Sequence, residues 1–517
     1  MEQNIKKSSS GDLTGQERFA WNLLVSWISQ LVLIFSGFIM PRLVDEKIGQ
    51  VALGVWDFGW SFVSYLSLVS FGMGACFNRY IAKHRAAGEI KQLNKVANST
   101  IFVQLILSIV AISCTIVFYF LLPVYFGSAL VENTVLAQWV ILFLGASVAV
   151  KMAMGAASGL LTGYHRWDLH NSIHAGDSLL SVSLMVLALY FTDLSIAGMA
   201  IGYLISTIVF ELLRVVCVTK ICKEFMFNLK LASWVTCKDA LIFGIKTMLS
   251  HVPPIILLQA ISIMLMSSIG PAALAIFARP VALTKQVKVF MTKFTFMLSP
   301  TAGSMQGQGD TKAIQALFLS TTKLSFAFAL PSLIFLGIYG DVILHYWMGP
   351  DYAIGTLIMI LAFGQILPMG QDTSLRILTG INQHGTISLF AFVAIFVLFG
   401  VGLLFVGFGN WELTTAALLF VIPMNIVYGV IVPIYTCREL KLPWWKYVYN
   451  SFIKPLIYIM PLVGLLLWSR YAYESHHLIQ ALLFVIAAGI VTLIVYFICL
   501  LPVHIKAKFL YAFKPQP

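Results

Sequence analysis

Charged side chains stand inside long apolar segments of this sequence, and Arg279 is the most informative of them. Gln286 and Lys293 follow it at intervals of seven residues, so the three side chains lie on nearly one face of a helix. A guanidinium binds phosphate through several hydrogen bonds of fixed geometry. We therefore expect this face to bind a phosphate-bearing ligand, with Arg279 as the principal contact. The alternative is a buried ion pair between Arg279 and an acid such as Asp57.

The first apolar segment carries a second polar stripe. Its members recur at every fourth position and are Arg18, Asn22, Ser26 and Gln30. Such a stripe is typical of a helix that lines a water-filled cavity, or of one that hydrogen-bonds to its neighbours. In the first case the substrate contacts are Arg18, Asn22 and Gln30, together with Lys246 of a later segment.

Four titratable residues inside apolar segments are candidates for ion coupling: Asp57, Asp177, Asp372 and His251. Ionisable groups at membrane depth are costly, so each is a functional candidate, and pairing with a nearby charge is the alternative. Asp372 has Arg376 one helical turn away, which favours a structural pair within one helix, and the same holds for Glu211 and Arg214. His251 titrates near neutral pH and is able to carry a proton, although a lone helix histidine is more often a packing group.

Proline, cysteine and nucleotide-binding motifs add further constraints. Pro253 and Pro254 interrupt an apolar segment, and a tandem proline removes two backbone donors. We expect a bend there that serves as a hinge. The seven cysteines show no metal-ligand spacing and no disulfide framework. Because the phosphate-binding motif GxxxxGK[ST] is absent from the sequence, we expect no cofactor and no ATP-driven step.

A membrane scaffold must position these residues. Of the 517 residues, 59% are hydrophobic and only 10% are charged, which leaves too few polar residues to cover a soluble protein. Apolar runs recur without the two-residue alternation of strands, which predicts an all-α polytopic membrane protein. About fourteen spans are expected, at residues 20–40, 50–72, 98–124, 135–161, 172–192, 195–219, 239–268, 271–294, 313–339, 355–379, 386–408, 412–436, 447–468 and 477–502.

A near-repeat at an offset of 221 residues organises the chain. Residues 48–56 are echoed by residues 269–277, and residues 88–91 by residues 309–312. The repeat predicts two pseudo-symmetric six-helix lobes around a central cavity, which is a common plan of secondary transporters. The expected divisions are an N-terminal lobe at 1–230, a C-terminal lobe at 231–440, and two additional helices with a short cytoplasmic tail at 441–517.

The distribution of positive charge predicts the orientation. With the N-terminus in the cytoplasm, the outer connections contain only Arg42, Lys47 and Arg470 of the chain's lysines and arginines, and the inner connections hold many more. This asymmetry favours cytoplasmic N- and C-termini in a bacterial inner membrane. It also explains most of the net charge of +12, so we expect contact with anionic phospholipid and none with nucleic acid.

Several short motifs together resemble the polysaccharide flippases of the multidrug/oligosaccharidyl-lipid/polysaccharide exporter superfamily. They are Asn78-Arg79-Tyr80-Ile81-Ala82, Ala87-Gly88-Glu89, Ile269–Ala278, Ser299-Pro300, Gly309-Asp310 and Tyr346-Trp347-Met348-Gly349. The resemblance covers residues 15–440 and implies a V-shaped pair of six-helix lobes with a central cavity. One departure is that Ser262, Met264 and Met266 occupy the seventh helix, where many relatives carry an acid.

The resemblance implies alternating access that carries a polyprenyl-pyrophosphate-linked oligosaccharide from the cytoplasmic to the outer leaflet. The product would serve the synthesis of O-antigen, capsule or exopolysaccharide, next to a polysaccharide polymerase or ligase in the same membrane. We therefore expect a transporter and not an enzyme. The alternatives are a peptidoglycan-precursor flippase, a drug or cation exporter of the same superfamily, and a membrane glycan polymerase or transferase. The enzyme alternative is disfavoured because the predicted outer loops are short.

Overall fold

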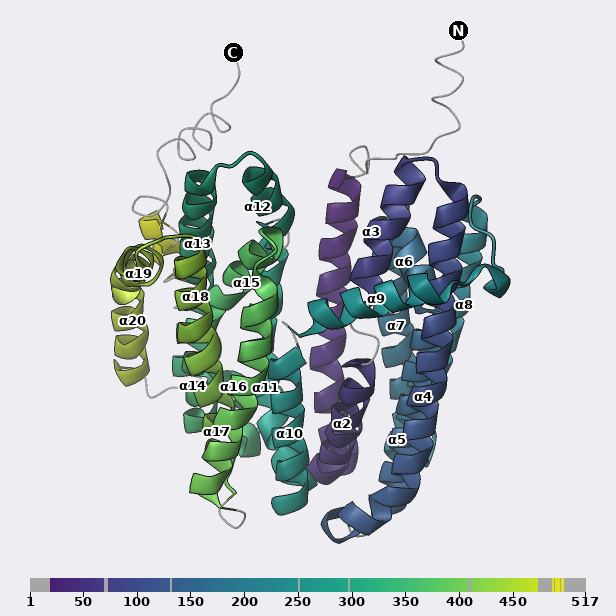
Figure 1. Ribbon diagram of the computed structural model, residues 1–517. Coiled ribbons are helices and arrows are strands. Elements are labelled where there is room, and N and C mark those ends of the chain that lie inside the picture. Colours follow the sequence, from purple (N-terminus) through teal and green to yellow (C-terminus); the bar gives the residue numbers. More distant parts are fainter. Residues whose placement is uncertain are drawn as a thin grey trace, which may run out of the picture. The chain divides into compact units, whose positions relative to one another are not determined.

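The computed structural model describes residues 19–68, 73–130, 133–249, 252–295, 298–407 and 411–472, with short pieces between 486 and 496. Within these ranges every regular element is a helix (Figure 1). The chain divides into two compact units, Met1–Ala275 and Ile276–Pro517. The predicted all-α membrane class is therefore confirmed.

Unit 1, Met1–Ala275, contains both long and short helices. Its elements are α2 (Phe19–Leu68), α3 (Met73–Ala86), α4 (Ile90–Leu130), α5 (Thr134–Ala153), α6 (Gly155–Gly163), α7 (Trp167–Phe191), α8 (Ser195–Ile221), η2 (Leu229–Leu231), α9 (Trp234–Met248) and α10 (Val252–Ser268). The helix α11 (Pro271–Thr295) begins in unit 1 and continues into unit 2.

Unit 2 contains α-helices that are separated or interrupted by short 3₁₀ and π-helical turns. Its elements are α12 (Leu298–Gly307), α13 (Thr311–Met348), η3 (Pro350–Tyr352), α14 (Gly355–Gly364), η4 (Leu367–Gly370), α15 (Gln371–Gly380), α16 (His384–Val406), α17 (Leu413–Met424), η5 (Asn425–Ile431), α18 (Val432–Glu439), α19 (Trp444–Val448), η6 (Tyr449–Ile453) and α20 (Lys454–Ala472).

Nine helical stretches within the described residues are long and apolar enough to cross a membrane. One of them, α2, contains two of the predicted spans, which join at Gly49 with φ 86° and ψ 169°. Large apolar side chains such as Phe120, Leu404 and Phe405 lie exposed on such helices, as expected of surfaces that contact lipid. The last predicted span, 477–502, lies largely outside the described residues.

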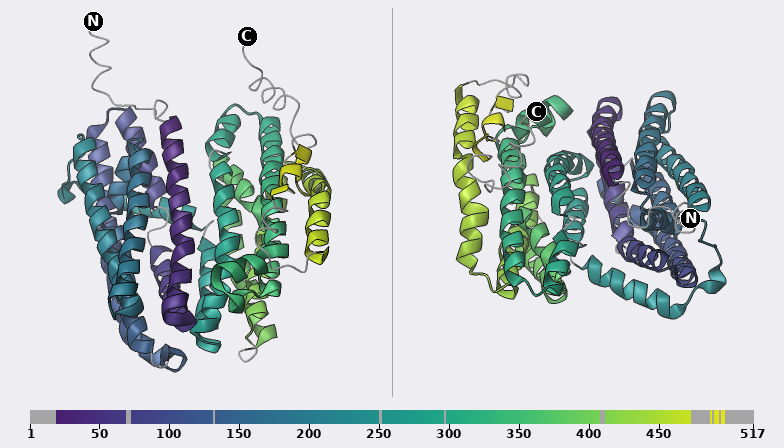
Figure 2. Two further views of the ribbon diagram at one scale, coloured as in Figure 1. Left: turned by 180° about the vertical axis from the view of Figure 1, so that it is seen from behind. Right: turned by 90° about the horizontal axis from the view of Figure 1, so that it is seen from above.

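The predicted span at 239–268 is two helices in the structure. The first, α9, packs against α3 and α4 and crosses them instead of running alongside (Figures 1 and 2). The second, α10, packs against α2. Pro253 and Pro254 therefore lie in the first turn of α10, where proline replaces donors that have no partner in the helix. The expected bend in mid-helix is replaced by a helix start, and a hinge role at this point stays a prediction.

The repeat is visible in the backbone at matching turns. Gly88 and Gly309, which are 221 residues apart, have φ values of 71° and 72°. At both, the glycine N–H donates to the carbonyl three residues earlier, at 3.1 and 2.9 Å. The next N–H donates to the carbonyl five residues before it, at 2.9 and 3.1 Å. Glycine suits this left-handed turn because it has no Cβ, so both halves end a helix in the same way.

The unit boundary differs from the predicted lobe boundary at 230/231. It lies at Ala275/Ile276, because α9 and α10 pack against helices of unit 1. In unit 2, α20 packs along α13. Arg470 Nη2 lies 2.5 Å from Asp341 Oδ2, and the hydroxyl groups of Tyr339 and Ser469 are 2.6 Å apart. The described part of the predicted C-terminal addition is thus closely packed within its unit.

Candidate functional site

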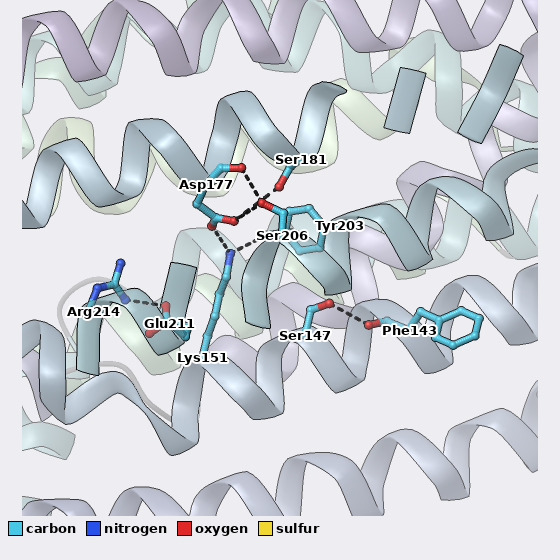
Figure 3. A network of polar contacts seen from close by, with 9 residues as sticks. All are labelled: Phe143, Ser147, Lys151, Asp177, Ser181, Tyr203, Ser206, Glu211 and Arg214. Atoms are coloured by element: carbon cyan, nitrogen blue, oxygen red, sulfur yellow. Dashed lines mark hydrogen bonds and ion pairs between the residues drawn. The ribbon is translucent and has the colours of Figure 1, made fainter. Parts of the chain in front are cut away.

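A polar network joins three helices of unit 1 (Figure 3). Lys151 of α5 places its Nζ 3.1 Å from Asp177 Oδ2 of α7 and 2.8 Å from the Tyr203 hydroxyl of α8. Ser206 of α8 donates to the carbonyl of Asp177 at 2.9 Å and to its Oδ1 at 2.8 Å. The Asp177 carboxylate therefore receives bonds from the α5 and α8 side chains. Charge-assisted bonds of this kind stabilise both charged forms in an apolar setting.

Asp177 was predicted to couple transport to an ion, and its carboxylate is held by the Lys151 ammonium. The side chain of Asp177 is 12% exposed and that of Lys151 is 32% exposed. An incoming cation must therefore compete with a cation that the chain itself supplies. Proton or ion binding at Asp177 would be coupled to release of Lys151, so this pair is the chemically relevant unit. The ion-coupling role itself stays a prediction.

A second buried pair lies nearby in α8. Arg214 Nη1 donates to Glu211 Oε1, and the two side chains are 8% and 5% exposed (Figure 3). Their spacing of three residues predicted this contact from the sequence. Lys151 and Asp177 both act electrostatically on Glu211. The two pairs thus form one charged region of alternating sign within unit 1.

The polar stripe of α2 meets α7 and the turn before it. Asn22 Nδ2 donates to the His165 carbonyl at 3.2 Å, and Asn22 Oδ1 accepts from the Asp168 N–H at 2.9 Å. One turn later, Ser26 Oγ accepts a bond from Asn171 Nδ2 at 2.7 Å. These bonds match the second alternative for the stripe, contact between neighbouring helices. Substrate contact by Asn22 would require these bonds to break.

The other predicted site residues of unit 1 lie at separate positions in the chain. Gln30 is half-buried on α2. Arg18 lies outside the described residues, as does His251. Lys246 lies in α9 instead of in a membrane-spanning helix, and its side chain is not among those described. Asp57 is half-buried in the second part of α2, and its backbone carbonyl accepts a bond from the Ser61 hydroxyl at 3.0 Å.

In unit 2, α11 carries the predicted phosphate-binding face. Arg279 is buried, with 4% of its surface exposed, and Gln286 is half-buried. Lys293 lies on the same helix, and its side chain is not among those described. The helix is 25 residues long and contains four cations and no acid. An apolar helix with charge of one sign is costly unless a neighbour or a ligand balances it.

Asp372 of α15 contacts several polar groups in the same unit. The Thr295 hydroxyl of α11 donates to its Oδ2, and Arg376 Nε lies 3.7 Å from the same oxygen. Asp372 also attracts Lys288 of α11 electrostatically. The predicted pair with Arg376 is confirmed as a contact, and the link to α11 is new. The sequence did not indicate Lys288, because it lies outside the seven-residue spacing that Arg279, Gln286 and Lys293 share.

Comparison with known proteins identifies the fold. Residues 26–168 match the sequence model of the MatE family. A multidrug resistance MATE family transporter of the MOP superfamily, in an inward-facing conformation, is 18% identical. The match covers 81% of this chain and 97% of that one, with a TM-score of 0.68. The fold is that of a MATE transporter. The predicted resemblance to the wider superfamily therefore holds at the level of the fold.

Further relatives of known structure agree. A MATE structure in a straight conformation is 17% identical, covers 83% of this chain and 97% of its own, and has a TM-score of 0.61. A MOP superfamily transporter from Pyrococcus furiosus is 16% identical, covers 83% and 96%, and has a TM-score of 0.64. That protein is described as having a binding pocket of reverse polarity that suggests a different function. No curated protein sequence matches this chain.

Proposed function

We propose that this MATE-fold protein is a secondary transporter that carries a polyprenyl-pyrophosphate-linked oligosaccharide to the outer leaflet of a bacterial inner membrane. The transporter class is supported by the MatE match and by the fold. The choice of an anionic cargo is supported by one observation above all. The helix α11 holds four cations and no acid, and Arg279 is buried within it.

The polarity of the described helices favours an anionic over a cationic cargo. Asp177, Glu211 and Asp372 each contact a lysine or arginine of the chain itself. A cation exporter needs acids that are available to its cargo, whereas a pyrophosphate needs hydrogen-bond donors with positive charge. A planar guanidinium binds two phosphate oxygens at once, which suits Arg279 to this role.

The cargo would need shelter for its head group only, because a polyprenyl tail can remain in lipid. The face of the protein that carries most of its lysines and arginines, which we assign to the cytoplasm, would attract the pyrophosphate. Rocking of the lobes would then expose the site on the other side. An ion gradient, the membrane potential or consumption of the product would supply the energy. A polysaccharide polymerase or ligase in the same membrane would consume that product.

Drug or cation export is the second candidate. It is favoured by the multidrug transporter among the structural relatives, which shares the fold over 81% of this chain. A peptidoglycan-precursor flippase is the third candidate, since its cargo presents the same pyrophosphate chemistry. These candidates differ in the charge and the head group of the cargo, so one transport assay separates them.

The test is transport by purified protein in proteoliposomes. The cargoes are a fluorescent polyprenyl-pyrophosphate glycan, a fluorescent peptidoglycan precursor and a fluorescent drug cation. We expect transport of the glycan lipid, a loss of at least tenfold in Arg279→Ala and partial activity in Arg279→Lys. Arg438→Ala removes an exposed arginine of unit 2 and serves as the matched control.

The outcomes separate the candidates. Full activity of Arg279→Ala would overturn the phosphate-binding role of this residue. Transport of the drug cation without the glycan lipid would replace the proposal with the exporter. Preference for the peptidoglycan precursor would move the proposal to the third candidate while retaining the role of Arg279.

A further inference from the structure

The segment after α8, including the first residues of α9, exposes large apolar side chains although it lies outside the membrane-spanning stretches. Met226, Phe227, Trp234 and Val235 are 66–71% exposed, which equals the exposure of Phe120 on a lipid-facing helix. Residues 222–238 are called the linker below. Exposed apolar side chains in water are unfavourable at this density, so the linker surface requires an apolar partner.

The linker backbone is held in place by α4. Asn94 accepts from the Met226 N–H at 2.6 Å and donates to the Glu224 carbonyl at 2.8 Å. One turn later, Asn98 accepts from the Asn228 N–H at 2.8 Å and donates to the Met226 carbonyl at 2.9 Å. Two asparagines thus bind alternate residues of the linker, as a neighbouring β-strand would. The exposed side chains therefore project from a defined backbone and not from a loose loop.

Positive charge accompanies the apolar side chains. Lys220, Lys223, Lys230 and Lys238 are all exposed. Glu224 is exposed as well, and one of its carboxylate oxygens accepts a bond from the Tyr164 hydroxyl, so the lysines outnumber the acid on this surface. A surface that combines aromatic and aliphatic groups with several lysines matches the interface of an anionic bilayer, where rings enter the head-group region and ammonium groups meet phosphate.

The direction of α9 agrees with such a position. It packs against α3 and α4 and crosses α4, which is one of the membrane-spanning stretches (Figures 1 and 2). Because α9 lies crosswise to α4 instead of running alongside it, its direction follows the plane of the bilayer more closely than the bilayer normal (Figure 1). Trp234 begins α9 and is 71% exposed, so it lies where the linker turns into this direction.

We propose that the linker is a membrane-surface anchor that binds anionic phospholipid through its lysines and the adjacent Lys220 of α8, and inserts Phe227 and Trp234 among the head groups. Such docking requires only a membrane-embedded chain, whatever cargo it carries. The anchor would fix the connection between α8 and α9 at the lipid surface. The proposal of lipid binding and the proposal of glycan transport are therefore tested independently of each other.

Insertion is tested by the fluorescence of Trp234 in the full chain. The protein has twelve tryptophans, so the difference between wild type and Trp234→Phe isolates this one. We expect quenching of the difference signal by lipids brominated near the head-group end of their acyl chains, and protection from aqueous iodide. Strong iodide quenching without an effect of brominated lipid would overturn insertion and leave this face free for a soluble protein.

The preference for anionic lipid is tested by removing the charge. The variant replaces Lys220, Lys223, Lys230 and Lys238 with glutamine, and its control replaces the exposed Lys441 and Lys446. Amide exchange of residues 222–238 is compared in nanodiscs of phosphatidylcholine alone and with phosphatidylglycerol. We expect at least tenfold slower exchange with phosphatidylglycerol in wild type and in the control, and a lost difference in the fourfold variant. Equal exchange in both lipids for wild type would overturn the anionic preference.

Discussion

Asn94 and Asn98 of α4 hold the linker through hydrogen bonds, which are called the asparagine clamp below. They allow a quantitative prediction for Asn98→Ala. Asn98 is completely buried, and its amide makes two bonds to the linker, to the Met226 carbonyl at 2.9 Å and from the Asn228 N–H at 2.8 Å. Each net hydrogen bond contributes about 1–1.5 kcal/mol, so losing both costs about 2–3 kcal/mol. Local opening of the linker should become about 30- to 150-fold more frequent.

Amide hydrogen exchange measures this opening directly. The Asn228 N–H loses its acceptor in Asn98→Ala, so its exchange should accelerate by the stated factor while the exchange of α13 is unchanged. Asn450→Ala is the matched control, because the half-buried Asn450 amide bonds to neighbours one turn away on its own helix, donating to the Lys446 carbonyl at 2.8 Å and accepting from Lys454 Nζ at 3.1 Å. Unchanged exchange at Asn228 would mean that the asparagine clamp does not hold the linker.

Two further changes test the interior of unit 1. Lys151→Met leaves the Asp177 carboxylate without its cation and should cost about 3 kcal/mol, whereas the double variant with Asp177→Asn should cost less than the sum of the single changes. Thermal unfolding in detergent measures this, and strict additivity would contradict the pairing. Gly54→Ala would place a Cβ 1.8 Å from the Pro271 carbonyl oxygen and should destabilise by about 1–3 kcal/mol. Gly37→Ala, which meets no atom within 4 Å inside α2, should cause no loss in the same assay, and equal losses would refute the steric argument.

Hydropathy predicted most of the helices because each apolar run must satisfy its backbone inside a bilayer. It failed at residues 239–268, because one apolar run there forms two helices, α9 and α10, and α9 packs across α3 and α4. Trp234 and Lys238 at the start of α9 are the signal that distinguishes the two, since both residue types favour the interface. The repeat was readable because the glycines at 88 and 309 are required by one backbone conformation.

The candidate site was less predictable than the fold. Helical spacing found the Glu211–Arg214 and Asp372–Arg376 contacts, because both partners stand on one helix. The bond between Lys151 and Asp177 joins two helices, and no periodicity within one segment encodes it. The same limit applies to the polar stripe of α2. Its spacing showed a polar face, whereas only the packing of α7 shows what Asn22 contacts.

The wide turn η5 has a consequence for chain length. It spans Asn425–Ile431 between α17 and α18, and Asn425 Nδ2 reaches across to the Gly364 carbonyl at 2.7 Å. A π-helical turn holds one residue more than an α-helical turn. Removing the exposed Ile426 would leave a continuous α-helix in which α18 keeps its direction and its buried face. A single deletion within α13 would instead rotate everything after it by about 100°. Insertions and deletions among homologous chains should therefore collect at η5.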